Sequence, residues 1–137
     1  MNTFAQTVDV LHRGMSATLV RHAVIANNVA NAETPGFKRS TVAFESELRR
    51  VLDSQRQRPA LELTRTNPMH FNNHRERDVR DVQIRRVVDF TSVYGNNGNN
   101  VDPEQEFVLM VKNQMTNLLL ARSIDFEFGQ VNRVLRG

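Results

Sequence analysis

The first part of the chain carries an amphipathic pattern that runs from Phe4 to Asn31. Its apolar positions, with Thr18 and His22 in the same register, recur at alternating steps of four and three residues, which is the seam pattern of a coiled-coil helix. The apolar stripe of such a helix needs a partner surface, because it gains nothing while it faces water. We predict that this stripe forms an interface through Phe4, Val8, Leu11, Met15, Ile25 and Val29.

A tight turn is predicted directly after this helix. Pro35 disfavours helical geometry at Thr34, and Gly36 is able to adopt a positive φ, so the four residues from Thr34 to Phe37 match a type II turn. Asparagine side chains just upstream are able to bond the backbone groups that are freed where the helix ends. The predicted turn and its supports comprise Asn28, Asn31, Thr34, Pro35, Gly36 and Phe37.

The middle of the chain, 38–101, is more polar and carries more basic than acidic residues. The spacing of its apolar residues predicts a short helix at 43–54 and weak strands at 61–64 and 82–90. The polar run at 72–78 has too few apolar residues to order itself, and we expect it to be flexible.

A second long helix is predicted from Pro103 to Leu135, after a break rich in glycine and asparagine at 95–100. Asp102 is a favourable N-cap residue, Pro103 suits the first helical position, and Gln105 completes a pattern like a capping box. An apolar stripe follows along this helix. We predict that it forms an interface through Val111, Met115, Leu118, Ile124 and Phe128.

These patterns predict a mainly α-helical fold in which two long terminal amphipathic helices form a coiled-coil-like unit. An N-terminal helix and turn occupy 1–37, and a C-terminal helix occupies 102–137. Between them, 38–101 is expected to hold a short helix, a minor β element and partly flexible chain. The long helices can pair antiparallel within one chain or pair across subunits, and periodicity does not choose between these arrangements.

Several kinds of chemistry are disfavoured by the composition. The chain has no cysteine, so it has neither a disulfide nor a thiolate nucleophile. His70 and His74 have the spacing of a helical metal pair, but Asn67 and Pro68 argue against a helix there, and we expect neither metal nor cofactor. No apolar run approaches the roughly 20 residues that span a bilayer, so we expect no membrane insertion. The N-terminal residues lack the pattern of a cleaved signal peptide.

Two other function classes are weighed against these features. The arginine-rich middle raises the alternative of a basic, helical nucleic-acid-binding protein, but acidic residues interrupt the basic ones and no regular pattern of aromatic residues is interleaved for base stacking. An enzyme would need a phosphate-binding glycine loop, a nucleophile elbow or paired carboxylates in an apolar pocket, and none of these patterns is present. We therefore expect a non-enzymatic protein without a nucleic-acid partner or a small-molecule substrate.

The segment from Ala26 to Lys38 resembles the N-terminal signature of the flagellar axial proteins, the family of rod, hook and hook-associated proteins. In that signature an amphipathic helix ends in Asn-x-x-Asn-x-x-Thr-x-Gly-Phe/Tyr, which this chain matches from Asn28 to Phe37. The segment from Gly98 to Asp102, followed directly by a long helix, is similar to the small proximal rod proteins of this family. The alternative is a neighbouring small rod protein of the FlgC type, although the insertion near the turn that is usual in that type is absent here.

The resemblance implies a structural subunit of the bacterial flagellar basal-body rod, located in the periplasm. It implies that the subunit polymerises with itself through its terminal helices, helps to link the MS-ring and export gate to the rod, and transmits torque. The implied partners are other rod proteins of the FlgC type, the adaptor FliE, the MS-ring protein and the flagellar type III export apparatus. On this basis we expect the two apolar stripes to pack mainly between subunits.

Overall fold

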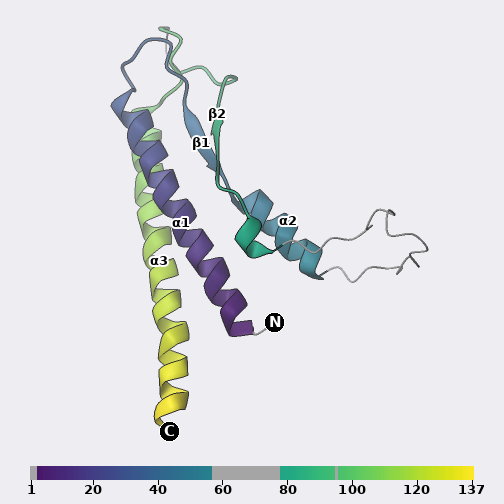
Figure 1. Cartoon of the computed structure of the whole chain (residues 1–137). Coiled ribbons are helices and arrows are strands. Elements are labelled where there is room, and N and C mark those ends of the chain that lie inside the picture. The colour runs from purple at the N-terminus through teal and green to yellow at the C-terminus, as the bar shows by residue number, and fades with distance from the viewer. Residues whose placement is uncertain (1–2, 57–77, 95) are drawn as a thin grey trace, which may run out of the picture.

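The structure is a computed structural model that describes residues 3–56, 78–94 and 96–137. Two long helices dominate it, α1 (Thr3–Ala30) and α3 (Pro103–Arg136). Between them lie β1 (Ser40–Ala43), α2 (Glu45–Arg56), a single 3-10 turn η1 (Val79–Asp81) and β2 (Arg85–Val88). The predicted fold class is confirmed: the chain is mainly helical, with long terminal helices, a short middle helix and a minor β element (Figure 1).

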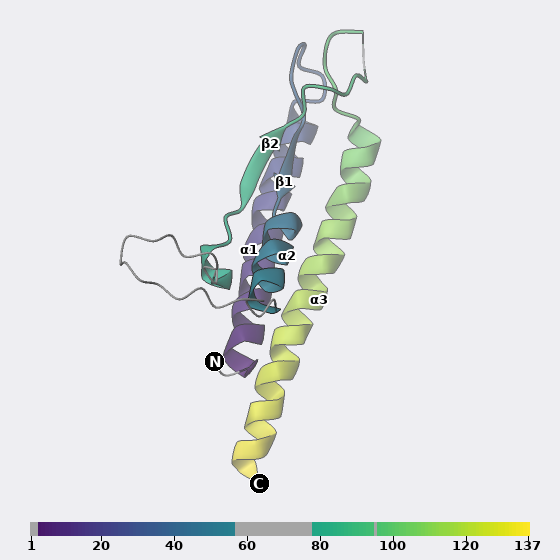
Figure 2. The ribbon, with the colours of Figure 1, turned by 90° about the vertical axis from the view of Figure 1, so that its right-hand side faces the viewer.

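The two long helices lie side by side and antiparallel, with the N-terminus of α1 and the C-terminus of α3 toward the same end of the molecule (Figures 1 and 2). Their predicted bounds agree with the observed ones to within one residue. α3 begins as predicted, because the Asp102 side chain accepts hydrogen bonds from the backbone N–H groups of Glu104 and Gln105 at 3.0 and 3.2 Å. α3 has 34 residues and α1 has 28, and α3 extends beyond the start of α1 (Figure 2).

A two-stranded antiparallel ribbon lies along the side of α1 (Figure 1). Ser40 pairs with Val88 and Ala43 pairs with Arg85. β2 falls within the predicted alternation at 82–90, whereas β1 is not predicted as a strand, because four residues of mixed polarity give no clear period. The predicted strand at 61–64 and all but Asp78 of the predicted flexible run at 72–78 lie outside the described residues.

The apolar core lies between α1, α2, η1 and the segments around the ribbon. Its buried members are Ala17, Phe44, Val51, Val79 and Val82. No residue of α3 belongs to this cluster, and the fully buried residues of α3 are the polar Glu106 and Asn113. The α1–α3 contact therefore combines buried polar residues of α3 with half-buried apolar ones such as Leu120 and Ile124, and it leaves the opposite side of α3 free.

Candidate functional site

The turn after α1 has the predicted geometry. The backbone N–H of Phe37 donates to the carbonyl oxygen of Thr34 at 3.3 Å, and Gly36 has a φ of 71°. These are the hydrogen bond and the left-handed residue that a type II turn requires. The N–H of Gly36 also donates to the carbonyl oxygen of Asn97 at 3.0 Å, so the turn is bound to the loop that precedes α3.

Asn99 closes the C-terminal end of α1 from that loop. Its side-chain amide lies 2.8 to 3.0 Å from the carbonyl oxygens of Asn31, Ala32 and Thr34. These three residues lie in the turn directly after α1, so an amide from the loop before α3 satisfies carbonyl oxygens that the helix itself does not. The Asn99 side-chain oxygen accepts from the N–H of Val101 at 2.7 Å, so one buried side chain connects the end of α1 to the approach of α3.

Asn28 makes the second connection, one turn before the end of α1. Its amide nitrogen donates to the Ser40 carbonyl oxygen at 2.8 Å, and its side-chain oxygen accepts from the Ser40 N–H at 3.0 Å. The same amide nitrogen lies 3.1 Å from a carboxylate oxygen of Glu106 on α3. Asn28 has no exposed surface, so it joins α1, β1 and α3 in the interior.

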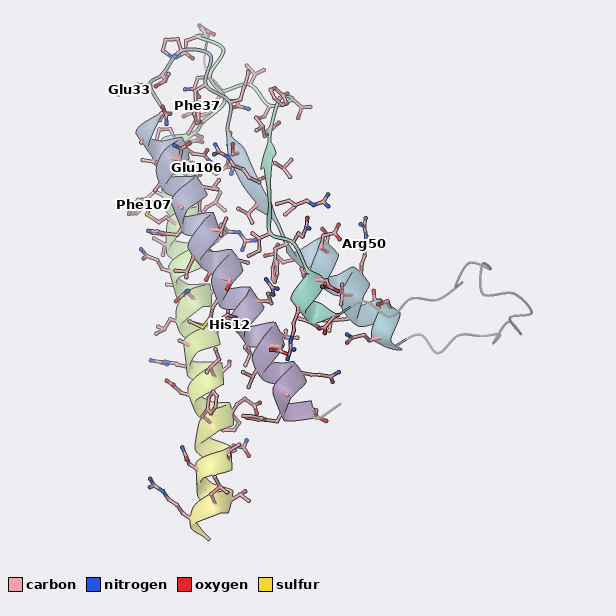
Figure 3. The ribbon with its side chains drawn as sticks, viewed as in Figure 1. His12, Glu33, Phe37, Arg50, Glu106 and Phe107 are labelled. Carbon is pink, nitrogen blue, oxygen red and sulfur yellow. The ribbon has the colours of Figure 1, made fainter. Side chains whose placement is uncertain are left out.

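Glu106 is a buried anion with a partner for each oxygen. One oxygen faces Asn28, and the other accepts from the Arg39 guanidinium in an ion pair. Only 1% of the Glu106 surface is exposed, so removing Arg39 would leave the Glu106 carboxylate buried without its counter-charge. We call Asn28, Arg39, Ser40, Asn99 and Glu106 the helix junction; Figure 3 shows Glu106 near the upper ends of the paired helices.

The loop after β2 is attached to the junction through Asn100. The Asn100 side chain accepts from the Arg39 N–H at 2.6 Å and donates to the Asp89 carbonyl oxygen at 2.8 Å. The Asp89 carboxylate accepts from the hydroxyl and N–H groups of Ser92 and Thr91, and these bonds, led by the Ser92 hydroxyl, hold the pKa of Asp89 well below its usual range. The loop is therefore held in one conformation by a set of local hydrogen bonds.

The contact between α1 and α3 below the junction is also polar. Asn113 donates from its side chain to the Thr18 carbonyl oxygen at 2.8 Å, and Asn117 donates to the Thr18 hydroxyl at 2.7 Å. The side-chain oxygen of Asn113 is buried and has no hydrogen-bond partner within the described chain. Further along, Gly14 lets the helices approach, since a Cβ there would lie 3.3 Å from a methyl carbon of Leu120.

The opposite side of α3 is apolar and exposed. Helical spacing places residues such as Val111, Met115 and Leu118 away from the side of α3 that carries Asn113 and Leu120. Met115 is 61% exposed and Leu118 is 54% exposed. Figure 3 shows Phe107 on the side of the helix pair away from the β-ribbon. We call this surface the outer face; its exposed members are Phe107, Val108, Val111, Met115, Leu118, Leu119 and Phe126.

The sequence of the chain is similar to those of known flagellar proteins. Residues 1–38 match the model of a family described as "Flagella basal body rod protein". The chain is 39% identical to the flagellar basal body rod protein FlgB of Borrelia hermsii, over 99% of this chain and 100% of that protein. It is 37% identical to FlgB of Borreliella burgdorferi with the same coverage, and 29% identical to FlgB of Bacillus subtilis over 100% of this chain and 98% of that protein.

The chain belongs to the FlgB family of flagellar basal body rod proteins. It is therefore a structural component of the flagellar rod, as the sequence predicts, in a family that is not one of enzymes. Membership decides between the two types of small rod protein that the sequence left open, in favour of FlgB over the FlgC type. No helix in the described part of the chain is long and apolar enough to cross a membrane.

The predicted interface residues of this FlgB-family chain fall on different surfaces. Ile25 is buried within the chain, and the ring of Phe4 packs edge-on against Phe128 with centroids 5.7 Å apart. The half-buried group consists of Phe4, Val8, Leu11, Met15 and Ile124. The exposed group consists of Val29, Val111, Met115, Leu118 and Phe128. The two predicted stripes therefore do not form one seam, and their packing between subunits stays a prediction.

Four residues of the helix junction are not predicted from the sequence, namely Arg39, Ser40, Asn99 and Glu106. Ser40 and Arg39 follow the turn and give no periodic signal, because their contacts are with distant residues. From the sequence alone, Glu106 is expected only to stabilise the helix dipole, as an acidic residue near a helix N-terminus. One signal was present for it: Glu106, Asn113 and Leu120 recur at steps of seven, which places them on one helix side.

Proposed function

We propose that the outer face of α3 packs against neighbouring subunits when the chain polymerises into the flagellar rod. The main observation in support of this proposal is the apolar surface itself, which runs from Phe107 to Phe126 along the helix. Nothing in the described chain covers this surface. Monomeric proteins seldom leave a contiguous apolar surface of this kind in water, and such surfaces mark sites of association. The flank of α1 that carries Val8, Met15 and Val29 is proposed as part of the same contact.

The balance of interactions on α3 supports this proposal. The inner side of α3 is held in part by hydrogen bonds, each of which stabilises a fold by about 1 kcal/mol net. A large apolar side chain that becomes fully buried contributes about 1.5–3 kcal/mol. More stabilisation is therefore available from covering Met115 and Leu118 than from the contacts that Asn113 and Asn117 make within the chain. Neighbouring subunits are proposed to supply that cover.

The helix junction is proposed to set the geometry of assembly. It holds the end of α1, the start of β1 and the start of α3 in one buried network. Because the ribbon begins at this point and α2 follows at the far end of β1, the junction sets the direction in which the ribbon starts (Figure 1). A subunit that joins the rod through its paired helices would then carry the middle of the chain in a defined orientation.

The wider role is proposed from the family. The chain would help to link the MS-ring and export gate to the rod and to transmit torque, with FliE, rod proteins of the FlgC type and the MS-ring protein as neighbours. The flagellar type III apparatus is the proposed export route. An apolar helical surface that stays uncovered until subunits meet is consistent with a subunit that is delivered singly and assembled at its destination.

Self-association of the purified chain tests the polymerisation step. Far-UV circular dichroism and sedimentation velocity are recorded together over a wide concentration range. We expect larger species to appear as the concentration rises, with helicity increasing in parallel, because neighbours stabilise helices that are only partly supported alone. A fully helical monomer at every concentration would contradict self-polymerisation through the outer face and would leave heterotypic packing with other rod proteins as the alternative.

A further inference from the structure

The molecule has a second pair of uncovered apolar surfaces, one at each end. At one end the turn after α1, the loop after β2 and the start of α3 meet, and the loop exposes Phe90, Val93 and Tyr94. We call these three residues, with Glu33 and Glu104, the head. At the other end α3 extends past α1 and exposes Val134 and Leu135 (Figures 1 and 2). We call these two residues, with Val131, Arg133 and Arg136, the tail.

The head presents its apolar side chains from a backbone that is already ordered. Asp89 binds Thr91 and Ser92, Asn100 binds both Asp89 and Ser92, and the N–H of Tyr94 lies 3.4 Å from the carbonyl oxygen of Asn99. Val93 is 82% exposed despite this order. A partner that covers a surface held in place in advance loses little conformational entropy on binding. Exposed aromatic side chains on such a loop are therefore suited to a docking contact.

The tail is the part of α3 that α1 does not reach. The pairing of Phe4 with Phe128 is the last ring contact between the two helices. The eight residues from Gly129 to Arg136 continue the helix for about 12 Å, at 1.5 Å per residue. Val134 is 82% exposed on this extension, so the described residues leave this apolar helix end without cover.

The two ends have opposite charge. Glu33 and Glu104 are exposed at the head, where Lys38 supplies an opposing charge and donates to the carbonyl oxygen of Gly98 at 2.8 Å. The tail carries Arg133 and Arg136 without an acidic residue after Glu127. The charges on α3 itself also suit the dipole of that helix. Glu33 does not have that explanation, because it follows the C-terminal end of α1, where the helix dipole disfavours an anion. The head therefore carries negative charge that its own helices do not require.

We propose that the head docks the C-terminal helix end of an adjacent rod subunit, an end that is apolar and basic as the tail of this chain is. The contact would join unlike surfaces at opposite poles of an elongated subunit. A contact of that kind repeats without closing on itself and extends an assembly along its axis. It rests on the proposed rod assembly and adds an axial contact to the sideways contact through the outer face.

Site-specific photo-crosslinking in assembled basal bodies tests the docking. A benzophenone amino acid replaces Tyr94 in a chain that supplies this rod subunit in a flagellated cell, and the peptide linked to it is sequenced by mass spectrometry. The same probe at Arg50 is the control, because Arg50 is exposed on α2, away from the head (Figure 3). We expect the Tyr94 probe to link to the last turns of the C-terminal helix of a rod subunit, and the Arg50 probe not to link there.

The charge contribution is measured in the same experiment. The substitutions Glu33→Arg and Glu104→Arg together are expected to lower the yield of that link about tenfold, which corresponds to about 1.4 kcal/mol. The pair Glu47→Arg and Asp53→Arg on α2 is the matched control and is expected to leave the yield unchanged. If the Tyr94 variant is not incorporated, the probe at Val93 repeats the test.

The outcomes separate the two proposals. If the chain is found in basal bodies but the head probes link to an outer face or to no rod subunit, the head-to-tail contact is wrong and rod assembly stands. A link to an unrelated protein, to lipid or to another part of a rod subunit overturns the contact in the same way. If the unsubstituted chain is absent from basal bodies, the assembly proposal and the contact that rests on it fail together.

Discussion

The substitution Leu118→Asp abolishes rod assembly and motility while the chain is still expressed and folded. Leu118 lies on the outer face and is 54% exposed, so a carboxylate there remains solvated in the free chain and disturbs no intrachain contact. In the assembled rod the same carboxylate would be buried against an apolar neighbour without a partner, in place of a side chain worth about 1.5–3 kcal/mol when covered. The effect repeats at each copy that uses this surface, so we expect complete loss of function.

The measurement for this substitution has three parts: swimming in soft agar, electron microscopy of isolated basal bodies, and circular dichroism of the purified chain. Thr116→Asp is the matched control, because Thr116 is exposed on α3 and helical spacing places it away from Val111 and Leu118. The control is expected to swim. Leu11→Asp is also expected to block assembly, but Leu11 is half-buried against the rest of the chain, so loss of folding contributes there. Normal swimming of the Leu118→Asp strain would count against the outer face as an interface.

The substitution Glu106→Ala lowers the free energy of unfolding by about 3 kcal/mol, the lower end of the range for breaking a buried ion pair. Glu106 is 1% exposed and bonds both Arg39 and Asn28, so its removal leaves a guanidinium and an amide without their acceptor. The Arg39 side chain is 18% exposed, which lets water relieve part of the penalty. The helix junction is expected to loosen, with the end of α1 and the start of α3 exchanging their backbone amides faster.

Urea unfolding followed by circular dichroism gives the size of this effect, and hydrogen exchange gives its location. Glu104→Ala is the control, since Glu104 is exposed two residues earlier on the same helix and a surface change there stays within about 0.5 kcal/mol. The double variant Arg39→Ala with Glu106→Ala is expected to lose less than the two single losses added together, because it removes both charges. A loss below about 1 kcal/mol for Glu106→Ala would show that the ion pair does not hold the junction.

The features that the sequence predicts correctly are those whose causes are local. The bounds of α1 and α3 follow from apolar periods, the start of α3 follows from the cap at Asp102, and the turn follows from Pro35 and Gly36. Each of these depends on residues within a few positions of one another. The helix α2 is predicted for the same reason, from four apolar residues on one side of a short segment.

The features that escape prediction depend on residues far apart in the chain. Asn28 meets Glu106 across 78 positions, and Asn99 meets Asn31 across 68, so no local pattern connects them. The apolar stripe of α3 indicates an interface, but periodicity leaves open whether the stripe faces the other long helix or a neighbouring subunit. In the structure α1 contacts the side of α3 on which Asn113 and Asn117 bond Thr18. Periodicity shows that a helix has two sides and does not show which side a given partner takes.

Burial of the outer face in the assembled rod is tested most directly by thiol labelling, since the chain has no cysteine of its own. Single variants Met115→Cys on the outer face and Arg49→Cys on α2 are labelled with a maleimide, first as free purified chains and then in isolated basal bodies. Both positions are exposed in the free chain, so both cysteines are expected to react rapidly there. In basal bodies we predict that Cys at position 115 becomes protected while Cys at position 49 keeps its reactivity. Equal labelling at position 115 in the two states would contradict packing through the outer face.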